Sequence, residues 1–264
     1  MSRSHTRTEN PSTARSARRP RNVPLLVGLT VGAVLWEVAG RFWLDPIFFA
    51  PLSRTALGFL EMVRTGELVE ALFESLQLFV IGFSSGAAAG LLLGVLIGRV
   101  AAIGAALEDY VTILYVTPPI ALVPFILSIL GFGVGPKSII VAWFVFFPVC
   151  ITTIEGVRAV SPRLLEVSRS FGSGELRTWR DVVIPSTVPY AMSGIRQGIA
   201  LGFVGVVAAE FLLDASGIGL LLRSFSRLYR MDKLLAAVLL MTALGLLIMA
   251  LGRLAERRFA PWRQ

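Results

Sequence analysis

The chain has 264 residues, of which 55% are hydrophobic and 16% are charged, and it carries a formal net charge of +8. Soluble domains average about 25% charged residues, so this composition and a mean hydropathy of +0.74 argue against a cytosolic enzyme. With one cysteine, Cys150, and one histidine, His5, the chain cannot form an intrachain disulfide, a histidine triad or a histidine-based metal site. We therefore expect an all-α, polytopic integral membrane protein.

Residues 1–22 form a polar segment with six arginines and a single acid, Glu9. No apolar core lies within this segment, so we expect a disordered basic cytoplasmic tail and not a signal peptide. The basic charge of the chain is expected to orient it in the membrane and not to bind nucleic acid. Contact of the tail with anionic lipid headgroups is the alternative.

Six apolar runs follow, each long enough for the roughly 20 residues that a helix needs to cross a bilayer. With the N-terminus inside, the cytoplasmic segments hold about twice as many Lys and Arg as the opposite side, which favours both termini in the cytoplasm. The runs predict a transmembrane domain over residues 23–258, followed by a short cytoplasmic tail, 259–264. They cover residues 23–43, 72–98, 108–131, 137–157, 188–212 and 233–252.

Prolines interrupt the third run at Pro118, Pro119 and Pro124, so we expect this span to be kinked or partly unwound. A loop near residues 99–107 is expected before it. An amphipathic helix over residues 53–74 is expected to lie on the outer membrane surface before the second span.

Two runs carry glycines at every fourth position, and such residues share one helix face. Glycine ladders let neighbouring backbones approach closely, so we expect internal helix packing, with a sliding or homodimer interface as the alternative. The ladders comprise Gly82, Gly86, Gly90, Gly94 and Gly98 in the second run and Gly194, Gly198 and Gly202 in the fifth.

The longest segment expected in the cytoplasm, about residues 158–187, indicates two short amphipathic helices joined by a turn. Ser161 and Pro162 are typical of a helix start, and Gly172 is typical of a helix end. The second helix is expected to close at Pro185. Apolar residues recur at helical spacing in both pieces, so each needs a partner surface, either the bundle or another protein.

Within this loop, Glu166, Gly172, Ile184 and Pro185 resemble the EAA loop of bacterial ABC importer permeases. That pattern is Glu-Ala-Ala, three residues, Gly, and then about nine residues before Ile-x-Leu-Pro. Gly172 follows Glu166 by six positions and Pro185 follows it by nineteen, as the pattern asks. Where this chain departs from the pattern, as with Val167 in place of the first Ala, the residue is similar in size to the one that it replaces.

The resemblance extends over about residues 51–258. It implies six spans in a bacterial inner membrane, pairing with a second permease subunit, and an extracytoplasmic substrate-binding protein. We expect the pair to be a homodimer, with a heterodimer as the alternative. It also implies ABC ATPase subunits that bind ATP and Mg, so that this chain is no enzyme and holds no cofactor. Four further segments carry a similarity to permeases of the nitrate, sulfonate and taurine type: 116–125, 146–149, 156–160 and 209–220.

The resemblance further implies that helix 162–171 is the coupling helix, which lies in a cleft on the ATPase. Glu166 would interact at that cleft and Gly172 would permit the turn. The chain has no phosphate-binding loop of its own, because the nearest run, 131–138, has Pro136 where the second Gly must be. The residues expected to couple the chain to the ATPase are Glu166, Gly172, Ile184, Pro185, Leu165, Ser168, Arg169 and Phe171.

Charges inside apolar runs are costly and are candidate functional groups. Arg196, together with Pro118 and Pro119, is a candidate for the translocation path of a small anionic solute. The alternative is that the Arg196 side chain snorkels toward the cytoplasmic edge of its span.

Acids near the span ends have simpler interpretations. Glu155 is expected to pair with Arg158, three residues on. Glu210 and Asp214 flank the outer end of the fifth span and are candidate docking residues for the binding protein. The glycine-rich stretch after them is expected to turn back toward the bilayer.

The leading hypothesis is the transmembrane permease subunit of an ABC importer for a small solute such as a sulfonate, taurine or nitrate. The alternative is a stand-alone secondary transporter or channel, although no inverted repeat and no chain of intramembrane carboxylates is evident. A membrane enzyme would need a nucleophile–base set, which a chain with one badly placed His and one badly placed Cys does not offer.

Overall fold

The computed structural model describes residues 22–213 and 216–259, and within these ranges it contains helices and no strand. The expected N-terminal tail lies outside the described residues except for Asn22, and the expected C-terminal tail except for Phe259. In chain order the elements are α1 (Asn22–Val38), the π-helical turn η1 (Ala39–Trp43), α2 (Leu52–Thr65), α3 (Glu67–Arg99), α4 (Ala101–Val116), the 3₁₀ turn η2 (Pro119–Leu122), α5 (Val123–Leu130), α6 (Val134–Arg158), α7 (Pro162–Ser170), α8 (Glu175–Thr178), the π-helical turn η3 (Trp179–Val183), α9 (Ile184–Leu213), α10 (Gly217–Arg227) and α11 (Met231–Phe259).

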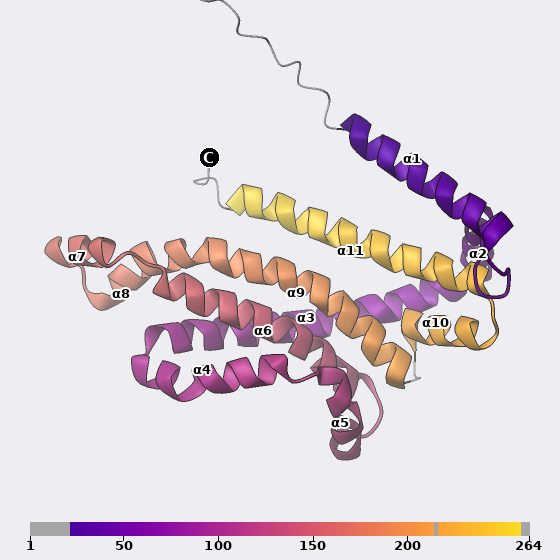
Figure 1. Ribbon diagram of the computed structural model, residues 1–264. Coiled ribbons are helices and arrows are strands. Elements are labelled where there is room, and N and C mark those ends of the chain that lie inside the picture. The colour runs from indigo at the N-terminus through magenta and orange to yellow at the C-terminus, as the bar shows by residue number, and fades with distance from the viewer. Residues whose placement is uncertain (1–21, 214–215, 260–264) are drawn as a thin grey trace, which may run out of the picture.

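Three long helices, α3, α6 and α9, lie side by side and form the centre of the bundle (Figure 1). The segment 158–187 projects from one end, the loop end, and α2 and α10 lie at the other, the α2 end. Five helices of the described chain are long and apolar enough to cross a membrane, and the bent pair α4 and η2–α5 adds a sixth if it counts as one span. The six apolar runs therefore correspond to these five helices and the bent pair.

Glycines on α3 and α9 set the spacing of the central helices. Gly82 lies against Val141 of α6, and Gly98 lies against Val157, so α3 and α6 run in the same direction. On the other side of α6, Gly194 meets the backbone of Val149, and α9 runs the opposite way. Because each glycine faces α6 of the same chain, the prediction of internal helix packing is confirmed for both ladders.

The third span is bent by 89° between Ala101–Val116 and Pro119–Leu130, which confirms the expected kink. Thr117 and Pro118 are both extended, with ψ of 123° and 112°, because each precedes a proline and is excluded from the α region. The expected loop near 99–107 is wrong. Val100 alone separates α3 from α4, so the third span begins directly after the second and no longer loop lies between them.

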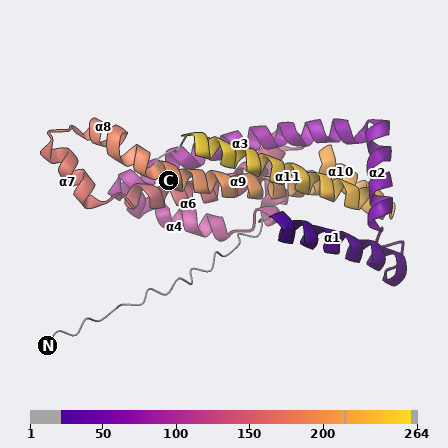
Figure 2. The same ribbon diagram turned by 90° about the horizontal axis from the view of Figure 1, so that it is seen from above.

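The expected surface helix over residues 53–74 is also corrected, because it is two helices. Gly66 takes a left-handed conformation, with φ of 81°, and ends α2, while α3 begins at Glu67. Figure 2 shows α2 crossing the end of the bundle at a steep angle to α3. There Gly58 packs against the backbone of Asp232, and Glu61 lies 3.0 Å from the Lys233 ammonium.

Helix α1 stands apart from the bundle and joins it only near α2 (Figures 1 and 2). The Trp36 indole donates a hydrogen bond to the Ala50 carbonyl, and the Glu37 carboxylate accepts hydrogen bonds from the backbone N–H and hydroxyl of Ser53. Glu37 thus provides an acceptor for one of the first N–H groups of α2, which have no acceptor within the helix itself. Most of α1 beyond this contact is exposed.

Candidate coupling loop

Helix α7 lies beyond the ends of the central helices, and none of its residues is buried. The second short helix of the loop, α8, does not close at Pro185 as expected. It continues through η3 into α9, because the widened π-helical turn before Pro185 accommodates a residue that has no N–H to donate. The loop is therefore continuous with a central helix of the bundle.

The two faces of α7 have different surroundings. Leu165 and Ser168 are half-buried toward α8 and η3, and the Ser168 hydroxyl lies 2.8 Å from the Thr178 hydroxyl. Glu166 is exposed, as are three apolar side chains of the same helix, one of which, Leu164, borders a recess beside Val182 and Pro185. The exposed fractions are 50% for Leu164, 51% for Val167 and 84% for Phe171.

The structure thus divides the expected coupling residues into two groups. Leu165 and Ser168 attach α7 to the rest of the loop, and Glu166, Arg169 and Phe171 remain exposed, as do Ile184 and Pro185 further along. Sequence reasoning did not include Leu164 and Val167 in this set, although both recur at helical spacing with Phe171.

Helix α7 ends in a Schellman turn built on Gly172. The Gly172 N–H donates to the Arg169 carbonyl at 2.9 Å, and the Ser173 N–H donates to the Ser168 carbonyl at 3.1 Å, which is the pairing of that motif. Gly172 has φ of 72°, so the sequence prediction of a glycine-permitted turn is confirmed. At the other end of α7, Ser161 makes no side-chain cap, and its backbone carbonyl instead accepts from Leu164.

Replacing Gly172 with alanine is expected to loosen this turn through backbone strain alone. A Cβ at Gly172 would meet no atom within 4 Å, but a non-glycine residue in the left-handed region costs about 1–2 kcal/mol. We expect roughly tenfold faster hydrogen exchange in residues 162–174 and reduced solute uptake. Gly174→Ala is the matched control, because Gly174 has φ of −66° and equally open surroundings. Equal exchange in the two variants would contradict the role of the turn.

The base of the loop is held to the bundle by packing and by one arginine. Val157, Val160 and Val183 form a small buried cluster beneath the loop. The Arg99 guanidinium, at the end of α3, lies 4.7 Å from the centre of the Trp179 ring and 3.0 Å from the Glu175 carboxylate. A cation over an indole face adds an attraction of about 0.5–1 kcal/mol at an exposed site, so α3 and η3 are joined here.

Arg158, the last residue of α6, pairs with Glu108 of α4 and not with Glu155 as expected. Two guanidinium nitrogens each donate to a carboxylate oxygen at 2.7 Å. This bidentate geometry is the strongest form of such a pair, which is why the distant carboxylate is preferred to one on the same helix.

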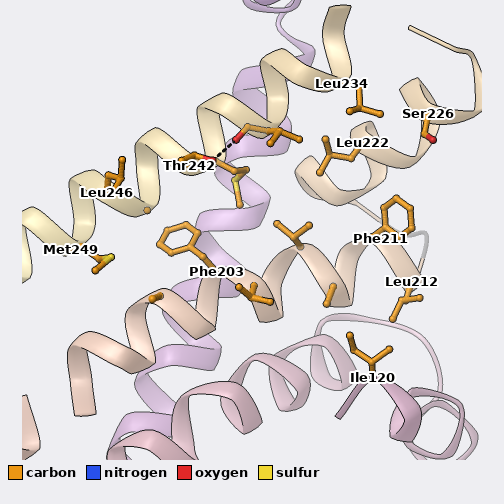
Figure 3. Close-up of a pocket in the computed structure, with 17 residues that line it drawn as sticks. Ile120, Phe203, Phe211, Leu212, Leu222, Ser226, Leu234, Thr242, Leu246 and Met249 are labelled. Carbon is orange, nitrogen blue, oxygen red and sulfur yellow. Dashed lines mark hydrogen bonds between the residues drawn. The ribbon is translucent and has the colours of Figure 1, made fainter. Parts of the chain in front are cut away.

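An apolar groove of about 790 Å³ lies along α9, α10 and α11 (Figure 3). Its polar members include Thr242, whose hydroxyl already donates to the Val238 carbonyl of its own helix. Ile120, which follows Pro119, reaches the groove, but the candidate path residues Arg196, Pro118 and Pro119 do not line it. The groove therefore offers surface to apolar groups and no charged group to a polar solute.

At the α2 end, a buried carboxylate joins three helices. Glu210 of α9 is 1% exposed and accepts hydrogen bonds from the Ser75 hydroxyl of α3 and from the Gly219 N–H of α10. The Ser75 hydroxyl accepts from the Ile218 N–H, and the Glu74 carboxylate accepts from the Gly217 N–H. Side chains of α3 and α9 thus satisfy the first N–H groups of α10.

This burial overturns the expectation that Glu210 docks a binding protein, since a side chain that is 1% exposed cannot reach a partner. Asp214, its companion in that prediction, lies outside the described residues. The stretch after α9 does turn back onto the bundle, since α10 packs against α3, α9 and α11.

Replacing Glu210 with alanine is expected to release α10. The Gly219 N–H and the Ser75 hydroxyl would lose a buried acceptor, and each unsatisfied group costs about 1–3 kcal/mol. We expect faster hydrogen exchange over residues 217–222 and a lower melting temperature in detergent. Glu210→Gln keeps one carbonyl oxygen for the Gly219 N–H and should show a smaller change. Equal melting temperatures of the alanine variant and the unmodified protein would contradict the role of Glu210 in holding α10 in place.

A family model described as "Binding-protein-dependent transport system inner membrane component" matches residues 87–261, about two thirds of the chain. The chain is 30% identical to an aliphatic sulfonates transport permease protein, SsuC, of Bacillus subtilis, over 89% of this chain and 87% of that protein. It is 24% identical to the taurine transport system permease protein TauC of Escherichia coli, over 92% and 90% of the two chains.

The nitrate import permease protein NrtB of Synechocystis is 30% identical over 67% of this chain and 64% of that protein. The fold is similar to a chain in the crystal structure of an amino acid ABC transporter with histidines, with a TM-score of 0.60 and 18% identity, covering 77% of this chain and 97% of that one. None of these findings favours a stand-alone transporter or channel. The chain belongs to the family of binding-protein-dependent transport system inner membrane components and is the membrane-spanning permease subunit of an ABC importer, in which ATP hydrolysis takes place on a separate subunit.

Proposed function

We propose that this permease imports a small oxyanion, of the sulfonate, taurine or nitrate kind, and that α7 couples its movement to ATP hydrolysis. The substrate class is supported by the relatives described as sulfonate, taurine and nitrate permeases. The observation that carries the coupling role is a projecting helix with one attached face and one exposed apolar face.

The exposed face of α7 is suited to a protein partner. A helix of nine residues is marginal by itself in water, and Leu164, Val167 and Phe171 form a contiguous apolar patch at helical spacing. Such patches mark interaction sites. The ATPase covers this patch, with Glu166 at its edge, and ATP and Mg are bound on the ATPase.

The attached face transmits the movement. Leu165 contacts the valine cluster beneath the loop, and the chain continues from α8 without a break into α9. Arg99 adds a link to α3. A displacement of α7 by the ATPase therefore moves the central helices as rigid bodies, and alternating access follows from their rearrangement.

Two copies of the chain form the transporter, each offering one coupling loop to one ATPase subunit. Both termini and the coupling loop lie in the cytoplasm, because the basic residues of segments 1–22 and 158–187 favour that side. Lipid covers the exposed apolar surface of α1. Arg196, Pro118 and Pro119 face the translocation path between the copies, where the proline break leaves backbone free to line a cavity.

The experiment that tests the proposal begins with mild detergent extraction of the tagged chain from its own cell and mass spectrometry of its partners. We expect an ATPase at a ratio near one to one. The complex is then reconstituted in vesicles with its binding protein, and uptake of labelled taurine, an alkane sulfonate and nitrate is measured. Accumulation of one of these only with ATP supports the proposal. Accumulation driven by an ion gradient without an ATPase would overturn it.

A further inference from the structure

The cavity beneath the coupling loop has a chemistry that the coupling role does not use. It has a volume of about 510 Å³ and lies between α7, the turn after it, α8, η3 and the ends of α3 and α6. Three arginines line it, Arg99, Arg158 and Arg169, together with one acid, Glu175. The lining thus carries an excess of positive charge in one recess.

The three arginines differ in how far they are neutralised. Arg158 forms its bidentate pair with Glu108, and Arg99 pairs with Glu175, which is itself 79% exposed. Arg169 has no ion pair or hydrogen bond from its side chain to any described residue. One full positive charge therefore remains without a counter-ion among the residues that the structure describes.

The cavity lining also has hydrogen-bond donors that are not used within the described residues and could bind an anion. A guanidinium has five N–H donors; Arg158 uses two on Glu108 and Arg99 uses one on Glu175. Ser173 lines the same cavity and carries a hydroxyl group. Guanidinium groups approaching from α3, α6 and α7 can surround a tetrahedral oxyanion from different directions, and their planar fork matches the oxygens of a phosphate.

The position of the cavity favours a phosphate over other anions. Arg99 and Arg158 are the last residues of α3 and α6, where these helices leave their apolar spans. Lipid phosphates gather at this depth of a bilayer, and basic pockets at helix ends bind headgroups there. We propose that this cavity binds one phosphate group, which connects Arg169 of α7 to the ends of α3 and α6 and stiffens the coupling loop.

The test uses the full chain in its complex with the ATPase, in a neutral detergent. Native mass spectrometry counts bound dioleoyl phosphatidylglycerol, with dioleoylglycerol as the lipid without phosphate. A second arm titrates inorganic phosphate against sodium chloride at equal ionic strength and follows the melting temperature. We expect one bound phosphate group per permease copy. Binding of the lipid alone identifies a headgroup, and a phosphate-dependent rise in melting temperature identifies a free anion.

Arg169→Gln is expected to weaken binding at least tenfold, because it removes a charge that no described side chain neutralises. Since Arg169 is exposed and unpaired among the described residues, the melting temperature without ligand should not change. Arg163→Gln is the matched control, because Arg163 lies on the same helix and does not line the cavity. Absence of binding in both arms, or equal binding by the Arg169 and Arg163 variants, would overturn the site.

Discussion

Replacing Glu166 with lysine is expected to lower ATP-driven solute uptake at least tenfold while the chain still inserts and folds. Glu166 is exposed on the outer face of α7, and its carboxylate has no partner among the described residues. The substitution therefore breaks no side-chain hydrogen bond or ion pair within the part of the chain that the structure describes. At a protein interface, however, a reversed charge opposite its former partner costs several kcal/mol. We expect ATP hydrolysis by the complex to continue without driving transport.

The measurement is uptake and ATP hydrolysis in vesicles that contain equal amounts of complex. Glu155→Lys is the matched control, since Glu155 is also exposed near the loop end but belongs to α6 and not to α7. The control should transport normally. Normal uptake by the Glu166 variant would remove α7 from the coupling role, and loss in both variants would point to a general effect of charge at this end.

Replacing Gly94 with leucine is expected to prevent the central helices from assembling. A Cβ at this position would lie 2.7 Å from the Cβ of Thr153 and 2.8 Å from the carbonyl oxygen of Cys150, against about 3.5–4.0 Å for a favourable carbon contact. The Cys150 carbonyl belongs to the backbone of α6 and cannot give way without moving that helix. We expect a loss of about 3 kcal/mol or more, a large fraction of the stability of a typical protein.

Gly32→Leu provides the comparison, because a Cβ at Gly32 of α1 would meet no atom within 4 Å. The yield of monodisperse protein and the melting temperature in detergent are measured for both variants. We expect a large fall for the Gly94 variant and almost none for the Gly32 variant. A Gly94 variant that melts like the unmodified protein would show that α3 and α6 do not need this close approach.

Much of the coupling loop could be predicted from local chemistry. The conformation of Gly172 and the start of α7 at Pro162 depend on residues within a few positions of each other, and spacing reveals such features. The orientation of α7 could not be predicted in this way. Leu164 and Leu165 are adjacent and equally apolar, yet one is exposed and the other packs beneath the loop, because only the position of η3 determines which side is covered.

The partners of the charged residues also could not be predicted from the sequence, because they lie on other helices. Glu155 lies three residues from Arg158 and is the natural partner by spacing, but α4 brings Glu108 into bidentate contact. Glu210 was expected at an exposed helix end, and α10 folds back to bury it against Ser75, 135 residues away. Pairing each charge with the nearest opposite charge in the sequence gives the wrong partner where another helix offers a better hydrogen-bond geometry.

By itself the sequence determined that the chain is a bundle of apolar helices, that one of them breaks at Pro118 and Pro119, and that glycine ladders lie between packed helices. These properties depend on composition, on helical periodicity and on the backbone limits of Pro and Gly, all of which act locally. Only the tertiary structure decided that both ladders face α6, that Glu210 holds α10 in place, and that three arginines share one cavity at the loop end. Those features bring together residues far apart in the chain, and no spacing along the sequence encodes such contacts.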